Sequence, residues 1–249
     1  MHSLARLTKS HVLLWIAVAG ILTVSAKMAW RLSESIALAR RSEPLQNSPT
    51  KPRTRLLIVG DSTAVGTGAS HPQASVAGLL VQDFPAMLIV NRARDGAQFA
   101  DVVSQMEGVE TFDMVLVMVG GNDVIRLRGL KELRDDVGRV TQRARELADC
   151  VVLMPAGNVG NAPFFFAPLS WVMEWRSRKL HSVVREAAGK YAAVYVNLFH
   201  EHSDDPFVLR PELNASDGLH PSDAGYQVWF RELLKQTQSL HCRSGSKPV

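Results

Sequence analysis

Five short apolar runs, separated by segments with helical periodicity, constrain the fold of this 249-residue chain more than any other feature. The runs are RLLIV at 55–59, MLIV at 87–90, MVLVMV at 114–119, CVVLM at 150–154 and AVYVNLF at 193–199. Helical patterns lie around 75–84, 97–108, 131–149, 171–190 and 222–238. A continuous apolar strand is typically buried on both faces, so the alternation predicts an α/β domain with a five-stranded parallel sheet between two layers of helices.

Short polar blocks follow three of these runs and precede the last helix. They are GDS at 60–62, DG at 95–96, GGND at 120–123 and DGLH at 217–220. Parallel sheets bind ligands beyond the carboxyl ends of their strands, so we expect the four blocks to meet at one edge of the sheet. One block alone is weak evidence for a catalytic site, because a serine after a strand is most often a helix cap.

Together the four blocks supply the groups that acyl transfer requires. Ser62 is the candidate nucleophile at a strand-to-helix turn, and His220 is the candidate base that removes its proton. Asp217 is close enough along the chain to orient the imidazole. The backbone N–H groups of Ser62 and Gly96, with the side-chain amide of Asn122, are the candidate oxyanion hole.

The order GDS, Gly, GxND and DxxHP resembles the SGNH (GDSL-type) hydrolases, which are esterases and lipases. The resemblance covers residues 55–240 and implies a flavodoxin-like three-layer sandwich and hydrolysis of carboxylic esters through an acyl-enzyme, with no cofactor and no metal. Two blocks depart from the family pattern without losing the reacting residue, because the first reads GDST and the third reads GGND. A GxSxG elbow, typical of the α/β-hydrolase fold, is absent from the sequence.

The segment 155–175 is long for a strand-to-helix loop and rich in aromatic residues. We expect Phe164, Phe165, Phe166 and Trp171 to wall an acyl pocket, which favours a lipidic ester such as a lysophospholipid or a medium-chain acyl ester. The same aromatics would also suit a cover over the sheet or a contact with the N-terminal segment. An acetylated carbohydrate is the alternative substrate, and a non-catalytic, membrane-tethered binding domain is the alternative of another class.

The N-terminus carries a fifteen-residue uncharged run, VLLWIAVAGILTVSA at 12–26, after Arg6 and Lys9. It predicts membrane targeting by residues 1–30, either as a retained anchor or as a secretory signal cleaved after Ala26. The protein would then be membrane-associated, or secreted or periplasmic, and the basic residues after the run favour a cytoplasmic domain if the anchor is retained. We expect a basic linker at 31–54, the hydrolase domain at 55–240 and a flexible tail at 241–249.

The basic character of the chain, with an isoelectric point near 9.3, comes from its N-terminal part. Residues 1–55 hold nine Lys or Arg and two Glu, a net +7, whereas the whole chain is +4. Residues 56–249 are therefore net −3, which argues against binding of nucleic acid.

Two further groups bear on metal binding. The segment His200-Glu201-His202 with Asp204 and Asp205 has metal-binding residue types, but we interpret it as a solvated polar turn and predict no metal site. The two cysteines, Cys150 and Cys242, are too few for a CxxC metal site and leave the redox compartment open.

Overall fold

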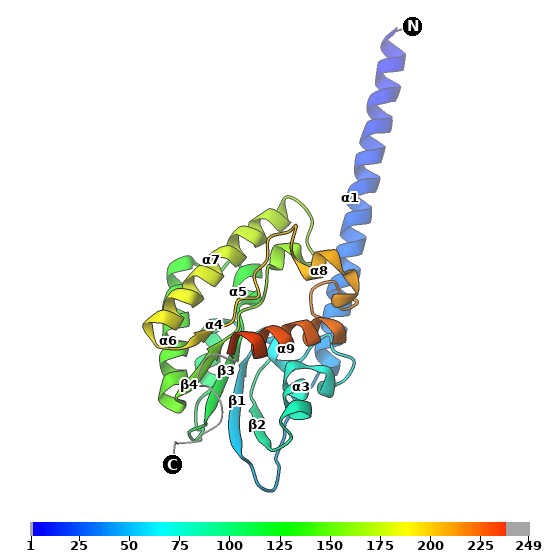
Figure 1. The fold of residues 1–249 in the computed structure, drawn as a ribbon. Coiled ribbons are helices and arrows are strands. Elements are labelled where there is room, and N and C mark those ends of the chain that lie inside the picture. The colour runs from blue at the N-terminus through cyan, green and yellow to red at the C-terminus, as the bar shows by residue number, and fades with distance from the viewer. Residues whose placement is uncertain (1, 238–249) are drawn as a thin grey trace.

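A computed structural model describes residues 2–237 of the chain (Figure 1). Residue 1 and residues 238–249 lie outside the described part, and so do the predicted tail at 241–249 and Cys242. In the first helix, the side chains of residues 2–10, 12–14, 16–17 and 21 also lie outside it.

The five apolar runs form one parallel sheet, as predicted. The strands are β1 (Thr54–Gly60), β2 (Met87–Asn91), β3 (Met114–Met118), β4 (Cys150–Leu153) and β5 (Val194–Tyr195). Their order across the sheet is β2-β1-β3-β4-β5, and every neighbouring pair is parallel. All the strand ends that carry the polar blocks therefore lie at the same edge.

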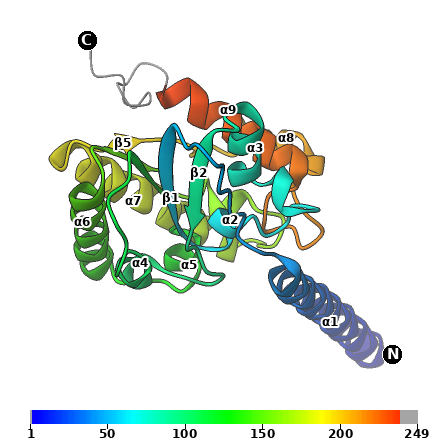
Figure 2. The same cartoon turned by 90° about the horizontal axis from the view of Figure 1, so that it is seen from below.

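Helices cover both faces of the sheet and complete the expected three-layer sandwich (Figure 2). Side chains alternate along β1, so Leu57 and Val59 face one core and Leu56 and Ile58 the other. The first core is closed by α4 (Phe99–Gln105), α6 (Leu130–Leu147) and α7 (Leu169–Lys190), and the second by α3 (Val76–Asp83) and α9 (Asp223–Thr237). Shorter helices at the carboxyl edge are α2 (Ser62–Val65), α5 (Gly121–Ile125) and α8 (Pro206–Leu209), with 3₁₀ turns η1 (Pro72–Ala74), η2 (Val159–Asn161) and η3 (Pro211–Leu213).

The N-terminal helix α1 (His2–Arg41) projects from the domain on the side of α8 and the start of α7 (Figure 1). It includes residues 31–41, which the sequence predicts to be linker. In the described part of the chain, no helix combines the length and the apolar character needed to cross a membrane. Membrane targeting by residues 12–26 stays a prediction.

The chain after α1 lies along the edge strand β2. The N–H of Asn47 donates to the carbonyl of Ile89 at 3.1 Å, and the N–H of Ile89 donates back to Asn47 at 2.9 Å. The Asn47 side chain also donates to the carbonyl of Met87 at 2.6 Å. Part of the predicted linker therefore covers the open hydrogen-bonding edge of the sheet.

Candidate active site

The end of β1 is held close to the end of β3. Gly60 has φ +147°, and a Cβ there would lie 1.8 Å from the carbonyl oxygen of Met118, so only glycine fits. The next residue, Asp61, caps α2 by accepting from the N–H of Thr63 at 2.9 Å. Its other oxygen accepts from the N–H of Gly120 at 3.2 Å. Asp61 thereby links the two strand ends and places Ser62 at the first turn of α2.

Asp61 is almost completely buried. Burial raises the pKa of its carboxyl, while the hydrogen bonds from Thr63 and Gly120 act in the opposite direction. Its cap on α2 therefore lies in a dry environment immediately before Ser62.

Ser62, His220 and Asp217 form a continuous hydrogen-bonded chain. His220 Nε2 lies 2.9 Å from Ser62 Oγ, and His220 Nδ1 lies 2.6 Å from Asp217 Oδ2. The other oxygen of Asp217 accepts from the backbone N–H groups of Leu219 at 2.9 Å and His220 at 3.1 Å. Asp217 is fully buried, which alone raises its pKa, but the hydrogen bonds and charge of His220 and the two N–H donors outweigh burial and lower that pKa. An ionised Asp217 favours the tautomer in which Nδ1 carries the proton and Nε2 accepts from Ser62.

The candidate oxyanion residues lie on two neighbouring segments. Asn122, in α5, donates from Nδ2 to the carbonyl of Ala97 at 3.1 Å, which ties α5 to the loop of Gly96. Gly96 has φ +75°. Ser62, Asn122 and His220 line one pocket of about 110 Å³, whereas Gly96 is not among its lining residues. Ser62 and Asn122 therefore lie together at the pocket. Gly96 directly precedes Ala97, whose carbonyl accepts the hydrogen bond from Asn122.

Part of the pocket wall is polar, a feature that was not predicted from the sequence. It includes Asn158, Asn161, Asp205 and Asn214, alongside the aromatic rings of Phe207 and Trp229. Asn158 and Asn161 follow β4 at the carboxyl edge, so their position after a strand was the available signal.

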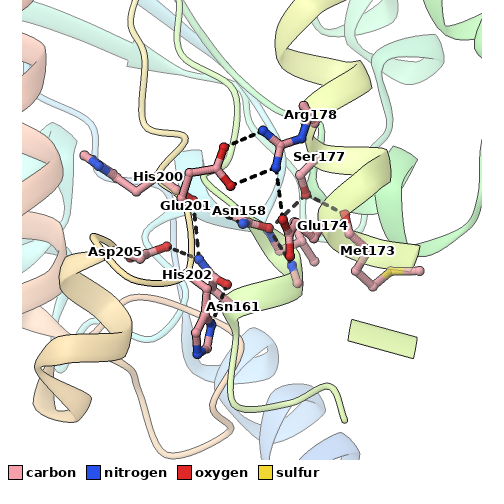
Figure 3. A network of polar contacts seen from close by, with 12 residues as sticks. Asn158, Asn161, Met173, Glu174, Ser177, Arg178, His200, Glu201, His202 and Asp205 are labelled. Atoms are coloured by element: carbon pink, nitrogen blue, oxygen red, sulfur yellow. Dashed lines mark hydrogen bonds and ion pairs between the residues drawn. The ribbon is translucent and has the colours of Figure 1, made fainter. Parts of the chain in front are cut away.

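Loop 200–205 braces this wall, as Figure 3 shows. Asn161 Nδ2 donates to Asp205 Oδ2 at 2.7 Å, and His202 Nδ1 lies 3.0 Å from Asn161 Oδ1. Asn158 Nδ2 donates to the carbonyl of His200 at 3.1 Å. The segment predicted to be a solvated turn is thus partly engaged with the pocket wall, and the described residues contain no group of three or more His, Cys, Asp or Glu that could hold a metal ion.

The four aromatic residues that the sequence predicts in an acyl pocket have other surroundings in the structure. Phe165 is 8% exposed and belongs to the core between the sheet and α7, with the Phe164 ring 5.0 Å away. Phe166 faces α1, and Trp171 is 67% exposed on α7. None of the four lines the pocket beside Ser62. The rings of Phe165 and Phe166 point away from the pocket, because the first packs in the core and the second contacts α1.

Asp123 is a second buried acid that the sequence analysis left without a role. It is fully buried, its Oδ2 accepts from the N–H of Phe99 at 3.1 Å, and its Oδ1 has no partner among the described residues. Burial, together with the charges of Asp61 and Asp136, raises its pKa to about 7 against the hydrogen bond from Phe99. Asp123 and Asn122 together anchor α5 to loop 96–99.

Comparisons with known proteins agree with this architecture. Residues 58–228 match the model of the GDSL-like Lipase/Acylhydrolase family. None of the curated proteins compared with the sequence matches it significantly.

Several solved structures share the fold. One is LAE5, an alpha/beta hydrolase enzyme from the metagenome of Lake Arreo, Spain, with 21% identity and a TM-score of 0.59 over 77% of this chain and 98% of LAE5. Another is Axe2, an acetylxylan esterase from Geobacillus stearothermophilus, with 24% identity and a TM-score of 0.57 over 75% and 94% of the two chains. A third is TesA, with 22% identity and a TM-score of 0.58 over 75% and 99%. Because the family match spans most of the chain, this protein belongs to the GDSL-like lipase/acylhydrolase family and is a hydrolase of carboxylic esters.

Proposed function

We propose that the protein hydrolyses short-chain acyl esters of polar alcohols through an acyl-enzyme on Ser62. The observation that carries this is the chain of hydrogen bonds from Ser62 through His220 to Asp217, at 2.9 and 2.6 Å. Ser62 Oγ attacks the ester carbonyl carbon while His220 Nε2 takes the hydroxyl proton. The same Nε2–H then protonates the leaving alcohol as its C–O bond breaks. Water repeats the sequence on the acyl-enzyme and releases the acid.

The oxyanion formed on the way would accept hydrogen bonds from Ser62, Gly96 and Asn122. The backbone N–H groups of Ser62 and Gly96 make no hydrogen bond within the described part of the chain. Asn122 Nδ2 uses one hydrogen on Ala97 and keeps the second. Each donor aimed at the developing charge is typically worth about 3 kcal/mol.

The pocket supports a short acyl group and a hydroxylated alcohol. Its volume is about 110 Å³, and Asn158, Asn161 and Asp205 are among the residues that line it. Amides and carboxylates bind hydroxyl groups by hydrogen bonds. An acetylated carbohydrate is the substrate class with both features, and Axe2, which shares the fold, is an acetylxylan esterase.

A lipidic ester is the second candidate. The observation in its favour is a row of exposed apolar side chains at the start of α7, formed by Leu169, Trp171, Val172 and Trp175. Attachment to a membrane by a retained N-terminal segment that includes residues 12–26 would bring this row close to lipid, whereas cleavage of that segment would release the domain. We place the hydrolase domain at residues 55–240.

A series of p-nitrophenyl esters from C2 to C16 tests the proposal. We expect kcat/KM to fall at least 10-fold between C2 and C8, because the pocket admits few methylene groups. A higher kcat/KM for C8, dependent on Ser62, would favour the lipidic candidate. Absence of a fluorophosphonate adduct on Ser62 in folded protein would favour the non-catalytic binding domain.

Two substitutions in the polar part of the pocket wall test whether it binds the alcohol part of the substrate. Asp205→Asn and Asn161→Ala should raise KM for acetylated xylo-oligosaccharides while leaving p-nitrophenyl acetate nearly unchanged. The matched control is Asp204→Asn, because Asp204 is exposed beside Asp205 and does not line the pocket. Equal effects on both substrates would contradict a sugar-binding wall.

A further inference from the structure

The second half of α1 contacts the turn that carries Asp217 and His220. Glu34 Oε2 accepts from Ser216 Oγ at 3.1 Å, across 182 positions of sequence. A Cβ built on Gly218 would lie 3.6 Å from the guanidinium carbon of Arg31. Arg31 and Glu34 are three positions apart, so they share one face of α1. Glu34 contacts Ser216, and Arg31 lies next to Gly218.

The aromatic loop completes this contact. The ring of Phe166 lies 5.3 Å from the guanidinium carbon of Arg31 and 5.5 Å from the ammonium of Lys27, both within the range of cation–π attraction. The N–H of Phe164 donates to the carbonyl of Gly218 at 2.9 Å. Three segments that are distant in sequence therefore meet at the turn behind His220.

Arg31 carries a positive charge close to Asp217. The Nη1 atom of Arg31 is buried and has no hydrogen-bond partner among the described residues. Burial lowers the pKa of Arg31, and the charge of Asp217 opposes that shift. An arginine keeps its proton throughout the range in which enzymes are assayed, so the turn carries a fixed positive charge beside it. Other charged or titratable groups lie near this turn. They are Glu34 and Lys27 of α1, Asp61, whose pKa the charge of His220 lowers, and Tyr226 of α9, whose pKa the charge of Asp217 raises.

We propose that Arg31 is a positioning residue of the active site, which holds the Asp217–His220 turn and places a fixed positive charge beside it. This deepens the proposed function and rests on it. The helix is then part of the catalytic unit as well as a candidate membrane segment. Cleavage after Ala26 would leave Lys27, Arg31 and Glu34 in place, whereas a chain that starts at Ser42, after the end of α1, would lose the contacts of all three.

The test is the pH profile of kcat/KM for p-nitrophenyl acetate, measured on the full chain. Arg31→Gln removes the charge, so His220 should take up its proton more readily. The acidic limb of the profile should then move to higher pH by on the order of half a unit. Arg31→Lys keeps the charge and should hold the limb near its wild-type position, while the lost planar contact with Phe166 lowers kcat by roughly 2- to 5-fold. A purely structural role would lower kcat at every pH without moving the limb.

The matched control is Arg40→Gln, because Arg40 is exposed on the same helix and, in the described part of the chain, no hydrogen bond or ion pair joins it to the turn. It should leave both kcat and the limb unchanged. If Arg31→Gln fails to fold, Arg31→Met keeps the aliphatic stem against Phe166 and carries the same prediction. An unmoved limb in folded Arg31→Gln or Arg31→Met would overturn this inference alone, since wild-type turnover that depends on Ser62 would still support the proposed function.

Discussion

His220 Nε2 lies 2.9 Å from Ser62 Oγ although the two residues are 158 positions apart in the chain. Ser62 owes its place to the cap that Asp61 forms on α2, and His220 owes its place to the turn closed by the N–H of Ala215 on the carbonyl of His220 at 2.8 Å. The hydrogen bond therefore joins the turn that follows the first strand to the turn that precedes the last helix.

Ser62→Ala and His220→Ala should each lower kcat by up to about 10⁶-fold. The two groups act in one proton transfer, so the double variant should be little worse than either single variant. Steady-state rates on p-nitrophenyl acetate, with circular dichroism to verify folding, measure both effects. Additive losses, or a tenth of the activity left in Ser62→Ala, would contradict the shared step.

Asp217→Asn should lower kcat by 10- to about 10⁴-fold, because the amide no longer selects the productive tautomer of His220. Because the pKa of Asp217 is lowered in the folded protein, the free energy of unfolding depends on pH in a defined direction. Its contribution to stability is complete above the ordinary pKa of an aspartate and is lost as the pH falls through the lowered value. Loss of activity in mild acid should therefore precede unfolding, which rates and melting curves recorded at the same pH values will show.

Gly68→Ala should displace His220. Gly68 has φ +98°, and a Cβ there would lie 2.4 Å from the carbonyl of Pro221 and 2.8 Å from the Cβ of His220. We expect a loss of about 10²-fold in kcat, the scale of a small misplacement of a catalytic group. Gly108→Ala is the control, since Gly108 has φ +61° and nothing within 4 Å of its added Cβ. Both variants carry backbone strain, so similar activities would show that strain rather than His220 is responsible.

Asp123→Asn should change the pH dependence of stability. The pKa of Asp123 is raised to about 7, so the folded protein holds this proton where the unfolded chain has released it. Asp123 therefore makes the wild type less stable as the pH rises from about 4 to 7. The Tm of Asp123→Asn minus that of the wild type should increase between pH 5 and pH 8. Asp135→Asn, at an exposed position on α6, serves as the control, and a difference that stays constant with pH would show that burial does not raise this pKa.

The apolar runs of the sequence were sufficient to predict the parallel sheet, because a strand buried on both faces needs uninterrupted apolar residues. The run at 193–199 formed only the short strand Val194–Tyr195, which pairs with β4. The polar blocks likewise pointed to Ser62 and Asn122, which follow the ends of apolar runs, and to Asp217 and His220, which precede the last helical pattern.

Side-chain direction in the loops was decided by packing between segments distant in the sequence. The composition of segment 155–175 shows that it is apolar, but Phe165 enters the core while Phe166 faces Arg31. Periodicity ends where regular structure ends, so it carries no information about which neighbour a loop side chain meets. The polar wall at Asn161 and Asp205 and the contact of Glu34 with Ser216 depend on such meetings, and only the tertiary structure establishes them.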